Sequence, residues 1–316
     1  MVNRMAKKIA LLFAGQGAQV VGMGKDLAEQ FPVAADLFRR GDEILGRKLS
    51  DIAWNGSIDE LTKTANCQPA LFVHGLACLA VLRKLAGNFP SAAAAGLSLG
   101  ELTAHASAET FGFDDGLRLV QKRGDLMNEA CNATVGGMAA MIGADENAVR
   151  QLADEEDVDV ANINSPGQIV ISGELAKVEA AVAVAKEHGI RRATMLNVAG
   201  AYHSRLMESA YQKFGAALID VQMQMPQFPV VSNVTGREVK TLPQIRQALQ
   251  EQVTSTVRWV DCEQRLFDLG CDLFIELGPG GVLVGLLKRF RKDVDVISLS
   301  DVESVKACAE RLKGTS

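Results

Sequence analysis

Residues 96–101 read Gly-Leu-Ser-Leu-Gly-Glu, and this stretch decides how the chain folds around its predicted chemistry. A serine between two such glycines is typical of a sharp turn from a strand into a helix. The turn strains the backbone and lifts the hydroxyl above the end of a sheet. The glycines are needed because a Cβ would collide with the neighbouring strand or helix. We therefore predict that Ser98 is a nucleophile, and the alternative is a buried turn with an idle serine.

The flanks of this turn favour an α/β arrangement. Residues 91–95 are small and apolar, as in a buried strand, and residues 99–108 have the composition of a helix. The amide of Leu99 would then lie at a helix N-terminus, where partial positive charge stabilises an oxyanion. Leu99 is therefore a predicted oxyanion donor.

A second glycine turn, Gly-Gln-Gly-Ala-Gln at residues 15–19, follows an apolar run at residues 8–13 that we expect to be a buried strand. Glycines after a strand suggest a dinucleotide site, but Val20 stands where that motif has its third glycine. A second amide donor for an oxyanion hole is the better use of this loop.

The composition excludes several classes of function. The chain has 316 residues, of which 48% are hydrophobic and 22% charged, and its net charge is −5. This predicts a soluble globular protein without a general affinity for nucleic acid or membranes. Six cysteines without CxxC or metal-ligand spacing predict reduced thiols, a cytoplasmic location and no metal site. No segment is expected to match the ~20 apolar residues of a membrane helix.

The remaining pattern predicts a large, discontinuous α/β domain formed by residues 1–133 and 199–316, with a mostly parallel sheet. The nucleophile would lie at the carboxyl edge of a strand in this sheet. Further helices are expected over residues 25–30, 33–45, 69–85 and 114–128, and strands over 229–233 and 272–277. Residues 278–281, Gly-Pro-Gly-Gly, predict a tight turn into a short helix.

Residues 134–198 differ in character and predict a small inserted domain. Strands are expected over residues 136–142, 158–164, 168–173 and 191–197, with helices over 146–156 and 174–188. The order βαββαβ is that of a ferredoxin-like unit.

A nucleophilic serine needs a base, and the chain has only four histidines. His105 lies seven residues along the helix that starts at the turn, about 10 Å from Ser98, and cannot reach it. His74 lies on an apolar helix and suits a core position, whereas His188 precedes a glycine at a helix end. His203 remains, at the exit from the small domain, where a hinge favours a cleft. The alternative is a histidine in a surface loop.

No acidic third member stands out in the sequence. A backbone carbonyl can orient the imidazole instead, because this role needs only a hydrogen-bond acceptor.

Arg123 is the second pointer to a site. On a helical wheel of residues 114–128 it falls among the apolar side chains, where a guanidinium is costly unless it is paired. It is either paired with an internal carboxylate, carried to solvent by its stem, or a buried receptor for a substrate carboxylate. The spacing leaves these alternatives open.

With these residues in place, the chain resembles the malonyl-CoA:acyl carrier protein transacylases, the acyltransferases of bacterial-type fatty acid synthesis and of polyketide synthases. The likeness runs from about residue 9 to residue 287 and rests on motifs in the same order. They are residues 15–19, 68–70, 96–101, 123–124, 162–168, 202–204, 257–259 and 276–280. The resemblance implies a hydrolase-like α/β core with a ferredoxin-like insert.

The resemblance also implies a ping-pong reaction. Ser98, deprotonated by His203, would attack malonyl-CoA and release coenzyme A. The phosphopantetheine thiol of holo acyl carrier protein would then take the malonyl group from Ser98. No bound cofactor and no metal are implied.

Further roles are implied by the same resemblance. The amides of Gln16 and Leu99 would hold the oxyanion, each worth about 2.7–4 kcal/mol. Arg123 would clamp the malonyl carboxylate, the backbone carbonyl of Gln252 would steady the histidine, and Asn162 would line the pocket.

The chain departs from the usual pattern at three places. Leu97 stands where many members have histidine, and Ser255-Thr256 replaces a common Asn-Pro. Tyr202 stands where malonyl-selective polyketide members often have phenylalanine. A bulky aromatic side chain there favours malonyl over methylmalonyl, by about 1–3 kcal/mol for one methyl group.

An acidic carrier would need a basic patch on this acidic protein. Lys288-Arg289 with Arg291-Lys292, or Lys186 with Arg191-Arg192, could supply it, although such runs also occur as solvated helix ends.

Three rival functions remain. A hydrolase would use the same serine and histidine with water, but one for uncharged acyl chains has no use for a buried Arg123. A silent binding module would be expected to lose Ser98, His203 or the glycines. A polyketide-pathway acyltransferase shares the chemistry and differs only in its carrier.

Overall fold

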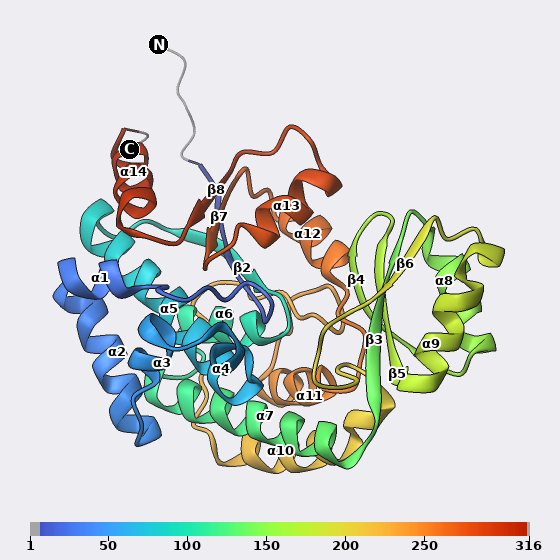
Figure 1. Ribbon diagram of the computed structural model, residues 1–316. Coiled ribbons are helices and arrows are strands. Elements are labelled where there is room, and N and C mark those ends of the chain that lie inside the picture. Colours follow the sequence, from blue (N-terminus) through green and yellow to red (C-terminus); the bar gives the residue numbers. More distant parts are fainter. Residues whose placement is uncertain (1–6, 315–316) are drawn as a thin grey trace. The chain divides into compact units, whose positions relative to one another are not determined.

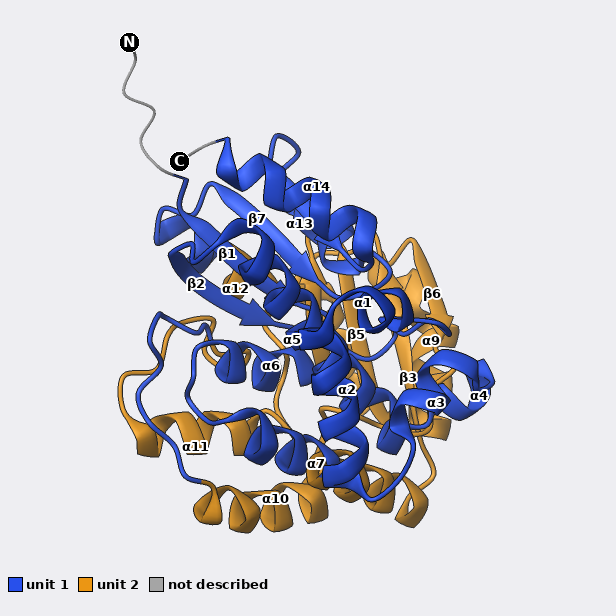
Figure 2. Cartoon of the chain, turned by 90° about the vertical axis from the view of Figure 1, so that its left-hand side faces the viewer, with its two compact units in different colours: residues 1–121, 222–231, 264–316 blue, residues 122–221, 232–263 orange. Residues whose placement is uncertain are grey.

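The computed structural model describes residues 7–314, and the chain divides into two compact units. Unit 1 contains residues 1–121, 222–231 and 264–316, and unit 2 contains residues 122–221 and 232–263 (Figure 2). These boundaries differ from the domain boundaries expected from the sequence, which stay a prediction.

Unit 1 is built on a parallel sheet of four strands in the order β2-β1-β7-β8 (Figure 1). Every residue of β1 and β7 is buried, as expected for parallel strands covered on both faces. The strands are β1 (Ile9–Phe13), β2 (Ser91–Gly96), β7 (Leu273–Leu277) and β8 (Val296–Leu299).

The helices expected over residues 25–30, 33–45 and 99–108 form with each boundary within one residue of the prediction, whereas those over residues 49–55, 58–62 and 302–313 are not among the expected ones. Helix α6 packs on β1 and β2, and α5 packs on α2 and α14. The helices are α1 (Lys25–Gln30), α2 (Pro32–Leu45), α3 (Leu49–Asn55), α4 (Ile58–Thr62), α5 (Thr64–Ala86), α6 (Leu99–Ser107), α13 (Val282–Phe290) and α14 (Val302–Lys313).

Helix α5 corrects two expectations. It is long and apolar enough to cross a membrane, but 83% of its most apolar window is buried inside the protein, as in a core helix. It also begins before Pro69, although proline cannot donate a helical hydrogen bond. The Ala65 carbonyl, which the missing N–H would have met, instead accepts a hydrogen bond from Arg47 Nη2 at 2.6 Å.

The strand expected over residues 229–233 is wrong. The segment reaches the sheet only through isolated bridge residues, among them Val230, which forms a parallel bridge with Ala94 of β2. The pairing stops because the chain turns at once, with the N–H of Gly236 donating to the Ser232 carbonyl at 2.9 Å.

Unit 2 contains an antiparallel sheet with the strand order β4-β5-β3-β6, and helices α8 and α9 cover one of its faces (Figure 1). The six elements occur in the predicted order, and every boundary falls within two residues of the prediction. They are β3 (Gly136–Ile142), α8 (Glu146–Glu155), β4 (Asp159–Ser165), β5 (Gln168–Glu174), α9 (Leu175–Val184) with a 3₁₀ turn (Ala185–His188), and β6 (Arg192–Met195).

Strand β4 is an edge strand, and another segment of unit 2 pairs with its outer side. The N–H of Val257 donates to the Ala161 carbonyl at 2.8 Å, and the N–H of Ile163 donates to the Val257 carbonyl at 2.9 Å. This pairing satisfies part of an edge that would otherwise present unpaired backbone groups. The remaining helices are α7 (Phe113–Ala133), which enters unit 2 from unit 1, α10 (Glu208–Asp220), α11 (Leu242–Glu251) and α12 (Trp259–Asp268).

Candidate active site

Ser98 occupies the turn between β2 and α6, at the carboxyl end of β2. Its backbone has φ 53° and ψ −104°, so the turn is strained as the sequence predicts. Close backbone approaches fix it. A Cβ on Gly96 would lie 2.0 Å from the carbonyl carbon of Gly100, and a Cβ on Gly100 would lie 2.1 Å from the Phe13 carbonyl oxygen. Both positions therefore require glycine.

The loop that carries Gln16 lies beside this turn within unit 1. The N–H of Leu97 donates to the Phe13 carbonyl at 3.1 Å. A Cβ on Gly15 would lie 2.4 Å from the Leu97 carbonyl oxygen. The two predicted amide donors, Gln16 and Leu99, are thus carried by adjoining loops at the carboxyl ends of β1 and β2.

His203 lies in unit 2, in the turn of residues 201–206, and also has a positive φ, 56°. Its Nδ1 donates to the backbone carbonyl of Gln252 at 2.8 Å, which is the contact that the resemblance implies. Because a carbonyl only accepts, Nδ1 keeps its proton and Nε2 is the nitrogen that can take one up.

The imidazole of His203 is uncharged at neutral pH. Burial and, after it, the positive charge of Arg123 together lower its pKa to about 4. The backbone groups of Gln252 and Ser255 act in the opposite direction. The side chain is therefore held in the form that accepts a proton.

Arg123 is fully buried on α7, which excludes the alternative of a stem that carries its guanidinium to solvent. Its Nη2 donates to the side-chain oxygen of Gln252 at 2.8 Å. Gln252 in turn donates from Nε2 to Asn233 Oδ1 at 3.4 Å. Gln252 therefore contacts the imidazole through its main chain and the guanidinium through its side chain.

The other predicted residues of this region are also placed. Asn162 is a buried residue of β4 and forms a bridge with Val257, in the segment that follows Gln252. Tyr202 is buried directly before His203.

The three remaining histidines have structural surroundings. His74 is fully buried, and its Nε2 lies 3.0 Å from the Ser300 carbonyl oxygen. His105 is buried with Nδ1 3.0 Å from Thr110 Oγ1, and burial lowers its pKa to about 3. His188 ends its helix before Gly189, which has φ 73°, as predicted.

Sequence reasoning missed Asn233 and the side chain of Gln252 as parts of this cluster. Gln252 lies 129 residues from Arg123 in the chain, so no local pattern joins them. Within residues 7–314, no group of three or more His, Cys, Asp or Glu side chains is placed to hold a metal ion.

Comparisons with known proteins identify the family of the chain. A sequence model of the family described as "Acyl transferase domain" matches residues 10–309. The chain therefore belongs to the acyl transferase family and is an acyltransferase.

The names of similar proteins are more specific than the description of the family. The malonyl CoA-acyl carrier protein transacylase of Bacillus subtilis (strain 168) is 42% identical, over 97% of this chain and 98% of the relative. The acyl-carrier-protein S-malonyltransferase from Bartonella henselae has a solved structure with a TM-score of 0.92 and 39% identity, covering 96% of this chain and 99% of the other. A malonyl-transacylase in complex with its holo type II PKS acyl-carrier protein has a TM-score of 0.91 and 36% identity, covering 96% and 99%.

Proposed function

We propose that the chain transfers the malonyl group of malonyl-CoA to the phosphopantetheine thiol of holo acyl carrier protein, for fatty acid synthesis. The observation that carries this is the double contact of Gln252 with the imidazole of His203 and the buried guanidinium of Arg123. A planar guanidinium close to a base suits an acyl group that ends in a carboxylate. The names of the relatives and the carrier complex support the same pair of substrates.

The proposed reaction proceeds in two transfers through a malonyl-Ser98 ester. Ser98 Oγ attacks the thioester carbonyl carbon while His203 Nε2 takes the hydroxyl proton. The C–S bond breaks, and the departing sulfur of coenzyme A takes the proton from His203. The carrier thiol then repeats these steps on the ester, and Ser98 regains its proton.

The other site residues stabilise the tetrahedral intermediates and select the malonyl group. The amides of Gln16 and Leu99 hold the oxyanion of each tetrahedral intermediate. Arg123 binds the malonyl carboxylate, and Asn162 lines the pocket. No bound cofactor or metal takes part.

The proposal extends to the architecture and setting of the enzyme. We assign residues 134–198 as a ferredoxin-like domain inserted into a hydrolase-like core, because the strands have the order β4-β5-β3-β6 and all of their pairings are antiparallel.

We place the enzyme in the cytoplasm, without nucleic-acid or membrane partners. The candidate carrier contacts are Lys288-Arg289 with Arg291-Lys292, or Lys186 with Arg191-Arg192. Arg291 also stacks on Phe267, at 3.9 Å from the ring centroid.

Intact-protein mass spectrometry after brief exposure to malonyl-CoA tests the proposal. We expect a malonyl adduct that is absent with acetyl-CoA and is discharged onto holo acyl carrier protein. The variant Ser98→Ala is expected to form no adduct, and Arg123→Ala to lose the preference for malonyl over acetyl.

Other outcomes have distinct meanings. An adduct that decays equally fast without carrier identifies a hydrolase. No adduct from either donor refutes the transacylase. Discharge onto a polyketide carrier but not onto a fatty acid carrier would assign the enzyme to the polyketide pathway. One of the similar structures is a malonyl-transacylase in complex with such a carrier.

A further inference from the structure

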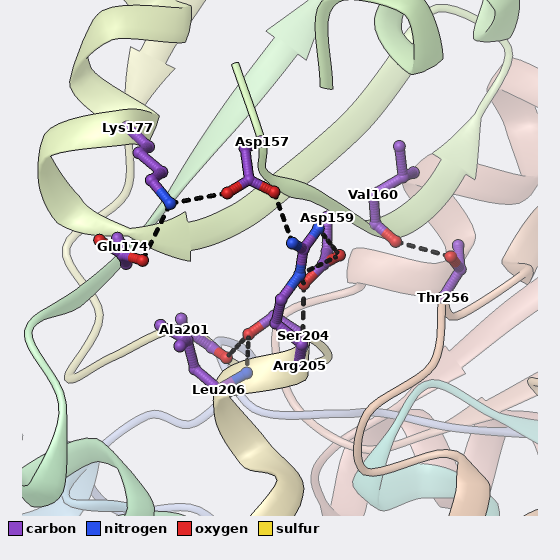
Figure 3. A network of polar contacts seen from close by, with 10 residues as sticks. All are labelled: Asp157, Asp159, Val160, Glu174, Lys177, Ala201, Ser204, Arg205, Leu206 and Thr256. Carbon is purple, nitrogen blue, oxygen red and sulfur yellow. Dashed lines mark hydrogen bonds and ion pairs between the residues drawn. The ribbon is translucent and has the colours of Figure 1, made fainter. Parts of the chain in front are cut away.

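The turn that carries His203 is held from outside by an ion-pair network, shown in Figure 3. Arg205, two residues after His203, is the centre of this network. Its guanidinium donates from Nε and Nη2 to the carboxylate of Asp159 at 2.9–3.1 Å, and from Nη1 to Asp157 at 2.5 Å. Its backbone N–H donates to Asp159 Oδ2 at 2.8 Å.

Asp159 therefore accepts hydrogen bonds from both the main chain and the side chain of Arg205, the second residue after His203. It is the first residue of β4, 46 residues away in the chain. The turn is also closed locally, because Ser204 Oγ donates to the Ala201 carbonyl at 2.7 Å and accepts from the N–H of Leu206 at 3.3 Å.

Strand β4 holds the partner of the histidine as well. Thr256 Oγ1 donates to the Val160 carbonyl at 2.6 Å, and Val257 pairs with the strand at Asn162. These contacts fix the segment that follows Gln252, whose carbonyl accepts from the imidazole. Consecutive residues of one edge strand thus fix the base and the group that orients it.

We propose that Arg205, through Asp159, is a positioning residue for the proposed base, a role that rests on the proposed function. His203 has a φ of 56°, a conformation that non-glycine residues keep only when their surroundings fix it. The Arg205 side chain is 57% exposed and contacts carboxylates of its own unit, so it acts on the reaction through the turn. When the turn loosens, the Nε2 atom of His203 moves from its position. Small displacements of a general base lower the reaction rate strongly.

The test is a single-turnover quenched-flow measurement of acylation by malonyl-CoA, with the full chain and without carrier. The rate constant reports the positioning of the base, and the amplitude reports the fraction of intact sites. For Arg205→Ala we expect a rate constant lower by about tenfold at full amplitude, with an unchanged malonyl-CoA concentration for half-saturation. Arg205→Lys is expected to recover much of the rate, because one ion pair can form.

Two further variants sharpen the result. Asp159→Ala is expected to be slower than Arg205→Ala, because it also removes the acceptor of the Arg205 N–H. Lys177→Ala is the matched control. It breaks ion pairs of the same network, with Asp157 at 2.7 Å and Glu174 at 3.0 Å, but leaves Arg205 and Asp159 in contact. Its rate constant is expected to equal that of the wild type.

Several outcomes overturn the inference. These are a wild-type rate constant in Arg205→Ala, a loss of amplitude alone, or an equal slowing in Lys177→Ala. If the wild type acylates normally, such results leave the proposed function intact, whereas a wild type without any adduct refutes both. A readout without substrate is the imidazole pKa of His203 by NMR, which is expected to rise in Arg205→Ala as water reaches the loosened turn, and to stay low in Lys177→Ala.

Discussion

The turns that carry Ser98 and His203 make an instructive pair. Each places a non-glycine residue at positive φ, 53° for Ser98 and 56° for His203. The Ser98 turn is forced by backbone packing, with Gly96 and Gly100 pressed against neighbouring main chain at distances that no Cβ tolerates. The His203 turn is held by side chains and carbonyls that come from distant parts of unit 2.

This difference shows two ways of storing strain at a proposed active site. In unit 1 the constraint is steric: Gly96 lies against Gly100, four residues on, and Gly100 lies against Phe13 of β1. Its requirement for glycine appears directly in the sequence. In unit 2 the constraint is polar and long-range, because the Gln252 carbonyl lies 49 residues from His203. Substitutions that add a side chain in the Ser98 turn should therefore abolish most of the activity. Substitutions that remove one polar contact of the His203 turn should reduce the activity only partly.

The largest effect is expected for Gly100→Ala. The new Cβ would lie 2.1 Å from the Phe13 carbonyl oxygen, so β1 or the turn must move. We expect acylation of Ser98 to fall at least about 100-fold, because the hydroxyl and the Leu99 amide move together. Overpacking of this kind also costs about 1–3 kcal/mol of stability. Denaturant unfolding and single-turnover acylation measure the two effects.

The matched control for this variant is Gly285→Ala. Gly285 lies on α13 in unit 1, and a Cβ there meets no atom within 4 Å. Replacing a helical glycine by alanine should raise stability by about 0.5–1 kcal/mol and leave acylation unchanged. An equal loss of acylation in both variants would contradict the steric explanation.

The same contrast explains what the sequence could predict. The Ser98 turn, strands β1, β2 and β7 and the βαββαβ order of unit 2 are local patterns of glycine and periodicity, and the sequence predicts them almost residue by residue. Strand β8 and helix α14 are not predicted. The strand at residues 229–233 was wrong, because a short apolar run does not reveal that the chain turns away at Ser232. The contact of the Gln252 carbonyl with His203 is implied by the resemblance. The contacts of the Gln252 side chain with Arg123 and of Arg205 with Asp159 are not predicted, since these partners lie 129 and 46 residues away and only the fold joins them.

The second prediction separates the two contacts of Gln252. In Gln252→Ala the backbone carbonyl still accepts from His203, but Arg123 loses a hydrogen bond of 2.8 Å. Loss of a hydrogen bond to a buried charged group predicts about tenfold weaker binding of malonyl-CoA. The saturated acylation rate should change little. A fall in that rate alone would show that the side chain, rather than the carbonyl, positions the base.

The third prediction concerns pH. His203 accepts a proton only while uncharged, so acylation should be constant above about pH 5 and fall as the pH drops through its pKa of about 4. In Arg123→Gln this limb should move to higher pH, because the second cause of the lowered pKa is gone. Arg123→Lys keeps the charge and should leave the limb in place even if malonyl binds less well.

The same lowered pKa makes a prediction for stability. The unfolded chain takes up a proton on His203 near its ordinary value of 6.5, whereas the folded chain resists uptake until about pH 4. The folded state therefore loses stability as the pH falls from about 6.5 to about 4. His203→Gln should reduce this loss by up to about 1.4 kcal/mol per pH unit in denaturant titrations.

The smallest effect is expected for Leu97→His, which introduces the histidine that the family resemblance leads us to expect before the nucleophile. The contacts of Leu97 that shape the Ser98 turn belong to its backbone: its N–H donates to Phe13 at 3.1 Å, and its carbonyl accepts from Gly100 at 3.0 Å. A new side chain leaves both intact, so acylation should change by less than about threefold. Single-turnover acylation beside Gly100→Ala makes the comparison direct. A large gain in the acylation rate would mean that side chains, and not only backbone packing, determine the geometry of the Ser98 turn. The Ser98 and His203 turns would then be more alike than their geometry indicates.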